Sequence, residues 1–360
     1  MATSVEILKK INKDHGKHIA TVGGSDYEDI ARLPTGIFAL DLAMGGGFPQ
    51  GKCSIVYGPE SSNKTNIVLL TIAVGQMMFP DKKAVFADAE HALDKKWART
   101  LGVDLDRLII VQPDSAEQCV DFVETFMYAE DVFMVALDSI AALITKNEIE
   151  SEATKVAVGG ASLLVGKMYR KVTHAMQAMS NEGKQAPAFI AINQIRTKIG
   201  VMYGNPETMP GGNPPKFASA MSLRCYGKNV LDKKINPVMP AFKEVNCVIH
   251  KWKCPILAIN AVYTMQMING AGNKPGYIKD WNTVSSYMKE LDYLAKGEKG
   301  GWIMHGVLYK TLDECQTALY GDPELLQDTK DQIVAELIAR GGLGESATAG
   351  SESESEGEAE

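Results

Sequence analysis

The sequence lacks any apolar run that approaches the roughly 20 residues needed to span a bilayer. Its first residues, Met1 to Glu6, also lack the basic-then-apolar order of a secretory signal. We therefore expect a cytoplasmic protein with no membrane partner. Hydrophobic residues make up 45% and charged residues 22% of the 360 positions, which excludes disorder throughout and allows one large domain with a smaller companion.

Cysteine is scarce and scattered. The six cysteines lie mostly inside apolar stretches, which is typical of reduced thiols in the core of a cytoplasmic protein. Cys247, His250 and Cys254 are close enough in sequence to suggest a metal site, but no fourth ligand is obvious. We expect these three residues to serve packing.

Basic residues are absent from Glu345 to the last residue, where apolar side chains are also few. This composition predicts a disordered acidic tail. Much of the net charge of −7 lies near this end, so the total charge argues only weakly against binding to nucleic acid. Two roles stay open for the tail: it solubilises the protein, or it competes within the molecule for a basic DNA-binding surface.

The pattern of apolar residues predicts one helix followed by an α/β fold. Segment 4–19 has helical spacing, with Ser4 available as N-cap and Gly16 near the end. From about residue 34 to 265, the short runs CSIVY, KAVFA, LIIV, VFMVALD and AFIAIN alternate with helical stretches, which predicts a mostly parallel twisted sheet. MSLRCY and EVNCVIH have no helix between them, which predicts an antiparallel end of the sheet.

These patterns divide the chain into four expected parts. Residues 1–33 form the N-terminal helix and a linker, and residues 34–269 form the core. Residues 270–344, with helical segments and Gly-rich connections, form a small C-terminal α/β domain. Residues 345–360 form the acidic tail.

The strand CSIVY runs directly into a short polar loop and then into an apolar helix, which is the order that a phosphate-binding P-loop requires. In such a loop the backbone N–H groups face the phosphates, Lys64 reaches the β and γ oxygens, and the Thr65 hydroxyl ligates Mg²⁺. Asn63 departs from the motif, which has glycine there. The candidate nucleotide contacts are Gly58, Pro59, Glu60, Ser61, Ser62, Asn63, Lys64 and Thr65.

A second acidic motif supports this interpretation. Asp138 ends the buried run VFMVALD, and a carboxylate at a strand end beside a P-loop orders Mg²⁺. Taken alone, an aspartate at the end of a strand could equally be a helix cap.

The motifs together resemble one family. GPESSNKT, FADAEHALD, LDSIAAL, INQIRTKIGVMYGNPET and GGNPPKF occur in the order and spacing of the nucleotide-binding and DNA-binding motifs of RecA-family DNA strand-exchange recombinases, over roughly residues 5–255. The C-terminal third is much less similar and, together with the altered P-loop, is similar to the phage recombinases of the UvsX kind. The resemblance implies a RecA-type P-loop ATPase core with an N-terminal polymerisation helix.

The resemblance also implies catalytic roles. Glu90 matches the glutamate that orients and deprotonates the attacking water, and Gln194 matches the γ-phosphate sensor. Lys251 and Lys253 resemble the pair that one subunit donates to the γ-phosphate held by its neighbour, and we expect both on one face of a strand. From the residues alone, Glu90 could be a capping acid and the lysines a solvated pair.

The adenine is expected to contact Asp94 through a hydrogen bond and Trp97 through stacking. Both positions come from the resemblance, in which a tyrosine usually stands where this sequence has Trp97. The exchange keeps a flat aromatic face.

The segment that follows Gln194 resembles the second DNA loop of the family. Arg196 and Lys198 can neutralise backbone phosphates, while Ile199 and Val201 can wedge between bases. Asn213, in the GGNPPKF string, belongs to the same DNA-binding region.

Three further assignments rest on the resemblance. Val158 resembles the tip of the first DNA loop, although a family arginine aligns with Leu163. Lys216 and Phe217 resemble the contact with a neighbouring subunit, whereas a buried Phe within one subunit is the alternative. Basic positions of the duplex site align with uncharged residues here, so we consider other lysines for that role: Lys233, Lys234, Lys296 and Lys299.

The family implies an ATP- and Mg²⁺-dependent recombinase that forms a homo-oligomeric helical filament on single-stranded DNA. It would pair that strand with homologous double-stranded DNA and hydrolyse ATP when DNA is bound. Single-strand-binding and loader proteins are possible partners. Two alternatives stay open: a ring-forming DNA motor that shares this core, and a non-hydrolysing DNA-binding module if Asn63 disables the P-loop.

Overall fold

The computed structural model describes residues 2–15, 30–151, 160–197, 207–270, 272–298 and 300–340. Internal contacts divide the chain into two compact units. The first unit comprises Met1–Leu33, Phe48–Glu60 and Lys64–Leu223, and the second comprises Pro34–Gly47, Ser61–Asn63 and Arg224–Glu360. No helix within the described ranges is both long and apolar enough to cross a membrane.

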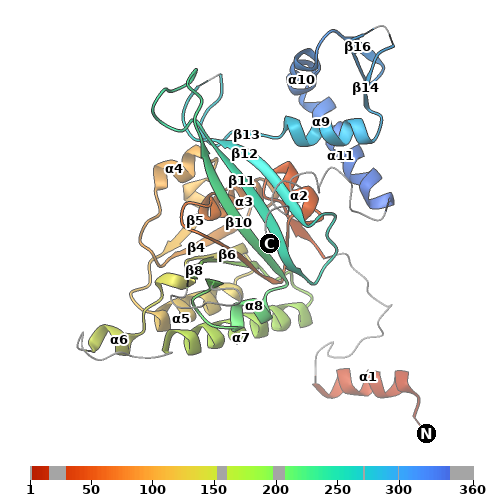
Figure 1. The fold of residues 1–360 in the computed structure, drawn as a ribbon. Helices are drawn as coiled ribbons and strands as arrows, with labels where there is room; N and C mark the ends of the chain where they lie inside the picture. The colour runs from red at the N-terminus through yellow and green to blue at the C-terminus, as the bar shows by residue number, and fades with distance from the viewer. Residues whose placement is uncertain are drawn as a thin grey trace, which may run out of the picture. The chain divides into compact units, whose positions relative to one another are not determined.

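The N-terminal helix α1 spans Ser4–His15 (Figure 1). Its N-cap is Thr3, so the prediction that Ser4 caps the helix was wrong. Thr3 Oγ1 accepts a 3.3 Å hydrogen bond from Glu6 N, while Thr3 N donates a 2.8 Å bond to Glu6 Oε2. This reciprocal capping box needs a glutamate three residues after the cap, which Thr3 has and Ser4 lacks.

Five neighbouring strands in the sheet of the first unit are parallel, which confirms the predicted α/β class. Its strands lie in the order β10-β3-β7-β6-β4-β5, and the pairs β3–β7, β6–β7, β4–β6 and β4–β5 are all parallel. The strands are β3 (Cys53–Gly58), β4 (Lys83–Asp88), β5 (Leu108–Val111), β6 (Val132–Asp138) and β7 (Ala188–Gln194). Strand β10 (Met221–Val230) begins in this unit.

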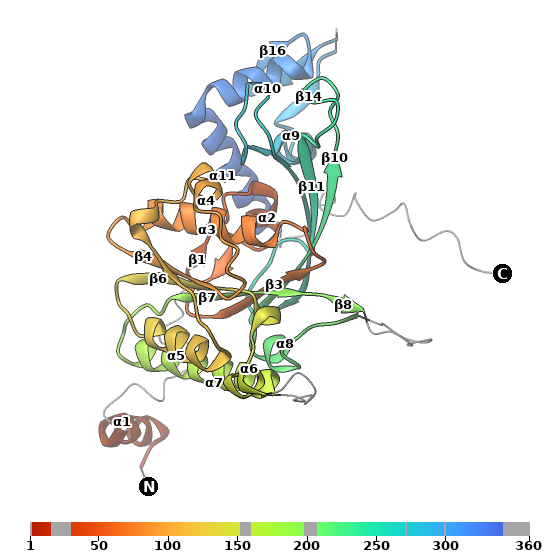
Figure 2. The same ribbon diagram turned by 90° about the vertical axis from the view of Figure 1, so that its left-hand side faces the viewer.

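Helices cover both faces of this parallel sheet (Figure 2). Helices α5 (Ala116–Met127) and α7 (Gly160–Asn181) lie side by side on one face, and α3 (Lys64–Met78) lies on the other. Tyr169 of α7 packs edge-on against Phe189 of β7, with ring centroids 5.6 Å apart. Because helices cover both faces of the sheet, β6 is buried along its whole length. A strand buried on both faces has a nearly continuous apolar sequence, as VFMVALD does.

The strand register brings the functional motifs to one edge. Asp88 lies opposite Asp138 at the ends of β4 and β6, and Gly58 lies opposite Gln194 at the ends of β3 and β7. Ligands of open α/β sheets bind at this carboxyl edge of the strands.

Shorter elements complete the first unit. They are β1 (Arg32–Leu33), β2 (Phe48–Pro49), α4 (Lys95–Thr100), α6 (Lys146–Glu150), β8 (Arg196–Thr197), β9 (Glu207–Thr208) and α8 (Pro214–Ala218). Two 3-10 turns lie at Leu105–Arg107 and Ile140–Ala142.

The second unit contains antiparallel strands and a helical C-terminal part. Strand β11 (Phe242–Trp252) follows β10, and β11, β12 (Asn260–Gln266) and β13 (Ile278–Lys279) pair antiparallel, as predicted for this end of the sheet. Helix α2 (Phe38–Ala43) belongs to the same unit.

The C-terminal part has its own apolar core around Tyr287, Met288, Leu319 and Ile333. It is built from α9 (Trp281–Glu290), β14 (Leu294–Lys296), β15 (Trp302–Met304), β16 (Val307–Tyr309), α10 (Leu312–Gly321) and α11 (Pro323–Ala339). The three short strands form an antiparallel sheet.

All six cysteines are buried and none forms a disulfide bond, as expected of core thiols. Cys225 Sγ and Cys247 Sγ lie 3.6 Å apart within the second unit. Among the described residues, no group of three or more His, Cys, Asp or Glu is arranged to hold a metal ion.

Candidate nucleotide site

The P-loop lysine begins helix α3 directly after the loop. Lys64 is 8% exposed, and its Nζ donates hydrogen bonds to the carbonyl oxygens of Gly58, at 3.2 Å, and Pro59, at 2.5 Å. These bonds keep a buried ammonium group at the carboxyl end of β3, where a phosphate group can replace the carbonyl partners. The loop backbone has positive φ at Ser61 (59°) and at Asn63 (74°).

Thr65 and Asp138 lie together, as required of a magnesium site. Thr65 Oγ1 donates a 2.7 Å hydrogen bond to Asp138 Oδ2. Burial raises the pKa of Asp138 to about 6; the Thr65 bond lowers it, and the nearby carboxylates of Glu90 and Asp88 raise it. A hydroxyl and a crowded carboxylate are hard oxygen donors that fit Mg²⁺, which commonly takes one or two protein ligands and completes its shell with phosphate and water.

Glu90 lies at the same edge with its carboxylate exposed to solvent. Glu90 Oε1 accepts hydrogen bonds from Ser139 Oγ, at 2.5 Å, and from Gln194 Nε2, at 3.0 Å. The backbone N–H groups of Ala89 and Glu90 donate to the Asp138 carbonyl at 2.8 and 3.2 Å. The predicted base, sensor and metal ligand are therefore brought together by contacts between β4, β6 and β7.

Asp88 orders the segment that carries Glu90, a role the sequence did not suggest. Its buried carboxylate accepts hydrogen bonds from Ala92 N (3.0 Å), Leu93 N (3.2 Å) and Gln112 Nε2 (3.2 Å). The only sequence sign was its position as the last residue of a β-rich run.

The two residues expected at the adenine lie at the start of α4. Asp94 caps this helix, accepting hydrogen bonds from Lys96 N (2.8 Å) and Trp97 N (3.0 Å). The indole N–H of Trp97 donates a 2.8 Å bond to Asn66 Oδ1 in α3, next to Thr65. Asn66 thus fixes the plane of the predicted stacking ring, and sequence reasoning had missed it.

A second missed residue, Asn193, connects the sensor to the segment that follows it. Asn193 is fully buried; its Oδ1 accepts a 2.9 Å bond from Gln194 N and its Nδ2 donates a 2.9 Å bond to the Pro210 carbonyl. Pro210 directly precedes the GGNPPKF string. One amide therefore contacts the backbone on both sides of the predicted DNA loop.

The ends of that loop are described, but most of its predicted DNA contacts are not. Arg196 is exposed in β8, which pairs antiparallel with β9 so that Arg196 lies opposite Thr208. Asn213 is exposed just before α8, and its carbonyl accepts bonds from Lys216 N and Phe217 N. The other predicted contacts of this loop, Lys198, Ile199 and Val201, lie outside the described residues, as does Val158 of the first predicted DNA loop.

The Phe217 side chain is 72% exposed, so most of its ring is not buried within its own subunit. It borders a groove of about 560 Å³ between α7 and α8, whose lining includes Tyr169, Arg170, His174 and Pro214. Lys216, beside it, is also exposed.

The expected geometry of the lysine pair needs correction. Strand β11 ends at Trp252, so Lys251 lies in the strand while Lys253 lies in the bend that follows it. Strand alternation therefore does not align their side chains. Burial, and to a lesser extent the charge of Lys253, lowers the pKa of Lys251.

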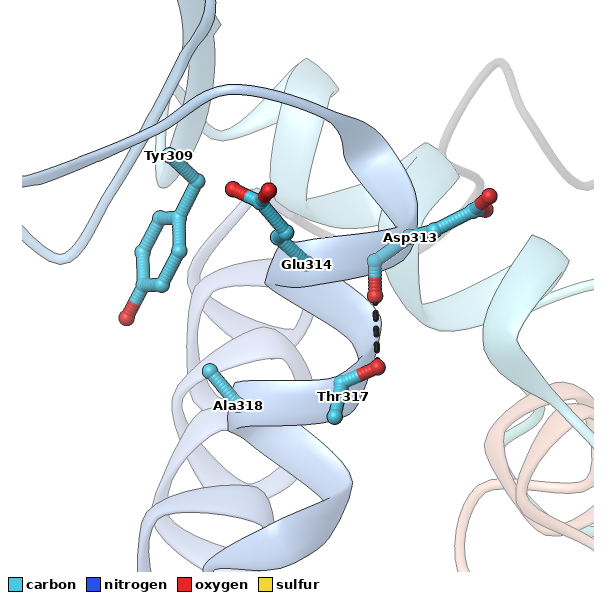
Figure 3. Close-up of a pocket in the computed structure, with 5 residues that line it drawn as sticks. All are labelled: Tyr309, Asp313, Glu314, Thr317 and Ala318. Carbon is cyan, nitrogen blue, oxygen red and sulfur yellow. Dashed lines mark hydrogen bonds between the residues drawn. The ribbon is translucent and has the colours of Figure 1, made fainter.

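A further hollow lies in the C-terminal part of the second unit, outside all predicted sites. Figure 3 shows its five lining residues, Tyr309, Asp313, Glu314, Thr317 and Ala318, around a volume of about 430 Å³. Thr317 Oγ1 donates a 2.8 Å bond to the Asp313 carbonyl within α10.

Comparisons with known proteins cover most of the chain. The family model of the RecA N-terminal domain matches residues 3–269. The protein RecA of Nautilia profundicola is 36% identical over 334 residues, which are 91% of this chain and 89% of the relative. The protein RecA of Symbiobacterium thermophilum is 37% identical over 336 residues, 92% of this chain and 91% of the relative. A solved structure, the RadB recombinase, is similar at a TM-score of 0.46 and 19% identity, over 65% of this chain and 96% of that chain.

Proposed function

This chain belongs to the RecA family, and we propose that it is an ATP-dependent recombinase that polymerises on single-stranded DNA and catalyses homologous pairing and strand exchange. Membership of the family confirms the resemblance that the motifs indicated, and it supports binding of ATP and DNA by this chain. The observation that best supports the finer proposal is the set of contacts from Glu90 through Gln194 and Asn193 to Pro210.

In the proposed reaction, water attacks the γ-phosphorus of ATP, the bond to the β–γ bridging oxygen breaks, and ADP and phosphate leave. Glu90 orients the water and takes its proton, because its carboxylate is exposed yet held by Ser139 and Gln194. Lys64 exchanges its carbonyl partners for phosphate oxygens. Thr65 and Asp138 would hold Mg²⁺, which supplies charge neutralisation on the β and γ oxygens.

Nucleotide state is proposed to reach DNA through Gln194. When ATP is bound, the Gln194 amide can donate a hydrogen bond to a γ-phosphate oxygen. After hydrolysis, the amide bonds to Glu90 again. Asn193 contacts the backbone of Gln194 and Pro210, so the nucleotide would set the balance between two arrangements of the described ends of the loop, near Arg196 and Asn213. Arg196, Lys198, Ile199, Val201, Asn213 and Val158 are the proposed DNA contacts.

Neighbouring subunits are proposed to share the active site. Phe217 and Lys216 contact the next subunit, and Lys251 and Lys253 reach the γ-phosphate that it binds. Each of these side chains would then make part of its contacts only in the filament, which makes assembly and ATP binding cooperative.

Duplex DNA is proposed to bind a basic lobe formed by residues 228–241, 267–270 and 272–274 of the second unit. Its exposed lysines are Lys228, Lys233, Lys234 and Lys274. The buried Gln266 amide fixes the lobe by donating to the carbonyls of Ile268 (2.9 Å) and Gly270 (2.8 Å). In contrast, Lys296 lies over the ring of Trp302, and Lys299 lies outside the described residues.

Phosphate release in the presence and absence of single-stranded DNA tests the proposal. We expect strong stimulation by DNA, together with helical filaments in electron micrographs. Rings in place of filaments would favour a DNA motor, and nucleotide binding without phosphate release would favour a non-hydrolysing binding module.

A further inference from the structure

Three strands of the second unit contact the central part of the P-loop, Ser61–Asn63. Gly227 of β10 passes so close that a Cβ atom there would lie 2.8 Å from the Ser61 carbonyl oxygen. Lys243 Nζ of β11 donates a 2.8 Å hydrogen bond to the same oxygen. Asn63 contacts β12 through its side chain. Ser61–Asn63 therefore packs against β10, β11 and β12.

Asn63 stands at the position where the motif has glycine and adopts the backbone conformation that glycine favours, with φ of 74°. Asparagine enters this region more readily than most other residues, but it still prefers negative φ. The residue is 6% exposed, and its Nδ2 donates to Tyr263 Oη at 3.0 Å and to Met265 Sδ at 3.3 Å. These contacts with β12 can offset the cost of the left-handed turn.

Tyr263 is a rigid acceptor for this bond. It is 3% exposed and lies in β12 opposite Val245 of β11. Burial raises the pKa of its hydroxyl well above the usual range, so the group stays neutral. Because the ring is enclosed, its oxygen has little freedom to follow Asn63 if the loop moves.

We propose that Asn63 and Tyr263 are positioning residues for ATP, whose hydrogen bond fixes the P-loop turn that directly precedes Lys64. Lys243 supports the same turn through the Ser61 carbonyl. Asparagine in place of glycine thus reduces the conformational freedom of the backbone and adds a buried side-chain hydrogen bond. A loop that is already fixed before binding loses less entropy when it closes on the triphosphate. This inference rests on the proposed ATP site.

A double-mutant cycle measures the effect. Affinity for a fluorescent ATP analogue, and KM and kcat for ATP on single-stranded DNA, are determined for the wild type, Asn63→Gly, Tyr263→Phe and the double variant. Each single change is expected to weaken binding about three- to tenfold, the range expected of one neutral hydrogen bond. KM should rise by the same factor while kcat changes less than about twofold, and the double variant should be no weaker than Asn63→Gly alone.

The controls separate two kinds of failure. Tyr287→Phe alters another buried tyrosine of the second unit and should leave KM unchanged. If Lys64→Ala binds the analogue as tightly as the wild type, the ATP site itself is wrong. If Lys64→Ala abolishes binding but Tyr263→Phe weakens it equally in the wild-type and Asn63→Gly backgrounds, the positioning inference alone is overturned. Asn63→Gly restores the motif residue, so wild-type or tighter binding by this variant also overturns the inference.

Discussion

Gln194 Nε2 donates a 3.0 Å hydrogen bond to Glu90 Oε1, which joins two residues 104 positions apart in the sequence. The same Glu90 oxygen accepts from Ser139, the residue after Asp138. The proposed water-activating group and the proposed phosphate sensor are thus direct partners. Any ligand that draws the Gln194 amide away also changes the environment of Glu90.

Replacing Glu90 with glutamine should abolish hydrolysis but preserve ATP binding. The amide keeps the size of the side chain but cannot take a proton from water, so we expect kcat to fall at least about a hundredfold, the usual worth of a general base. Filaments formed with ATP should persist longer than those of the wild type. Phosphate release measures the loss, and Glu130→Gln, an exposed glutamate that pairs with Lys184, is the control. Equal rates for Glu90→Gln and the wild type would exclude the assigned role.

Replacing Asn193 with alanine should uncouple hydrolysis from DNA. The change leaves the Pro210 carbonyl and the Gln194 N–H without their partner, at a cost of about 1–3 kcal/mol in stability for each buried group. We expect the stimulation by single-stranded DNA to fall at least about tenfold, measured as the ratio of ATPase rates with and without DNA. Thr71→Val removes a different buried hydrogen bond, inside α3, and should keep the ratio. A ratio unchanged in Asn193→Ala would mean that the coupling runs elsewhere.

Sequence alone predicted those elements that are determined by residues close together in the chain. The runs that became β3, β6 and β7 were predicted correctly because their apolar pattern is local, and the P-loop residues and Asp138 could be proposed because each directly follows or ends such a run. The contacts of Asn66, Asp88 and Asn193 were not found, because their partners depend on strand register and helix packing. The same holds for Asn63 and Tyr263, which are 200 positions apart. Lys253 was placed on a strand because no local feature marked the end of β11.

Stability should fall as pH rises from about 4 to about 7 because of Asp41. Burial raises the pKa of Asp41 from 3.8 to about 7 and outweighs the hydrogen bonds from Thr35 and Gly36. Between these two pKa values the folded state holds a proton that the unfolded state has lost, so the free energy of unfolding falls with rising pH until Asp41 deprotonates near pH 7, and Asp41 adds no further pH dependence above that. Between pH 5 and pH 8, the free energy of unfolding of the wild type should fall by about 3 kcal/mol relative to that of Asp41→Asn. The fall occurs over the about two pH units between pH 5 and the pKa near 7, at 1.36 kcal/mol for each unit. Parallel denaturation curves for the two proteins at both pH values would refute this assignment.

Duplex DNA should bind more tightly after deletion of residues 345–360, which carry acidic but no basic side chains. The gain should be largest at low salt, where screening is weak. Lys233→Ala with Lys234→Ala should weaken duplex binding and remove most of the gain from the deletion, because the same lobe would bind tail and DNA. Fluorescence anisotropy over a salt series measures both effects, with Lys52→Ala and Lys310→Ala as the charge-matched control. If the deletion leaves duplex affinity unchanged at low salt, the tail only solubilises.

The shared active site is the central claim, and mixing two inactive variants tests it most directly. Glu90→Gln lacks the base, and Lys251→Ala with Lys253→Ala lacks the charges donated to the neighbour. In a mixed filament some interfaces combine an intact Glu90 with intact lysines from the adjacent subunit. The measurement is phosphate release by the mixture on single-stranded DNA: we predict partial recovery, up to about a quarter of the wild-type rate if an equal mixture assembles at random and each interface acts alone. A mixture that forms joint filaments but stays as inactive as its components would contradict the account and would assign Lys251 and Lys253 to DNA contact.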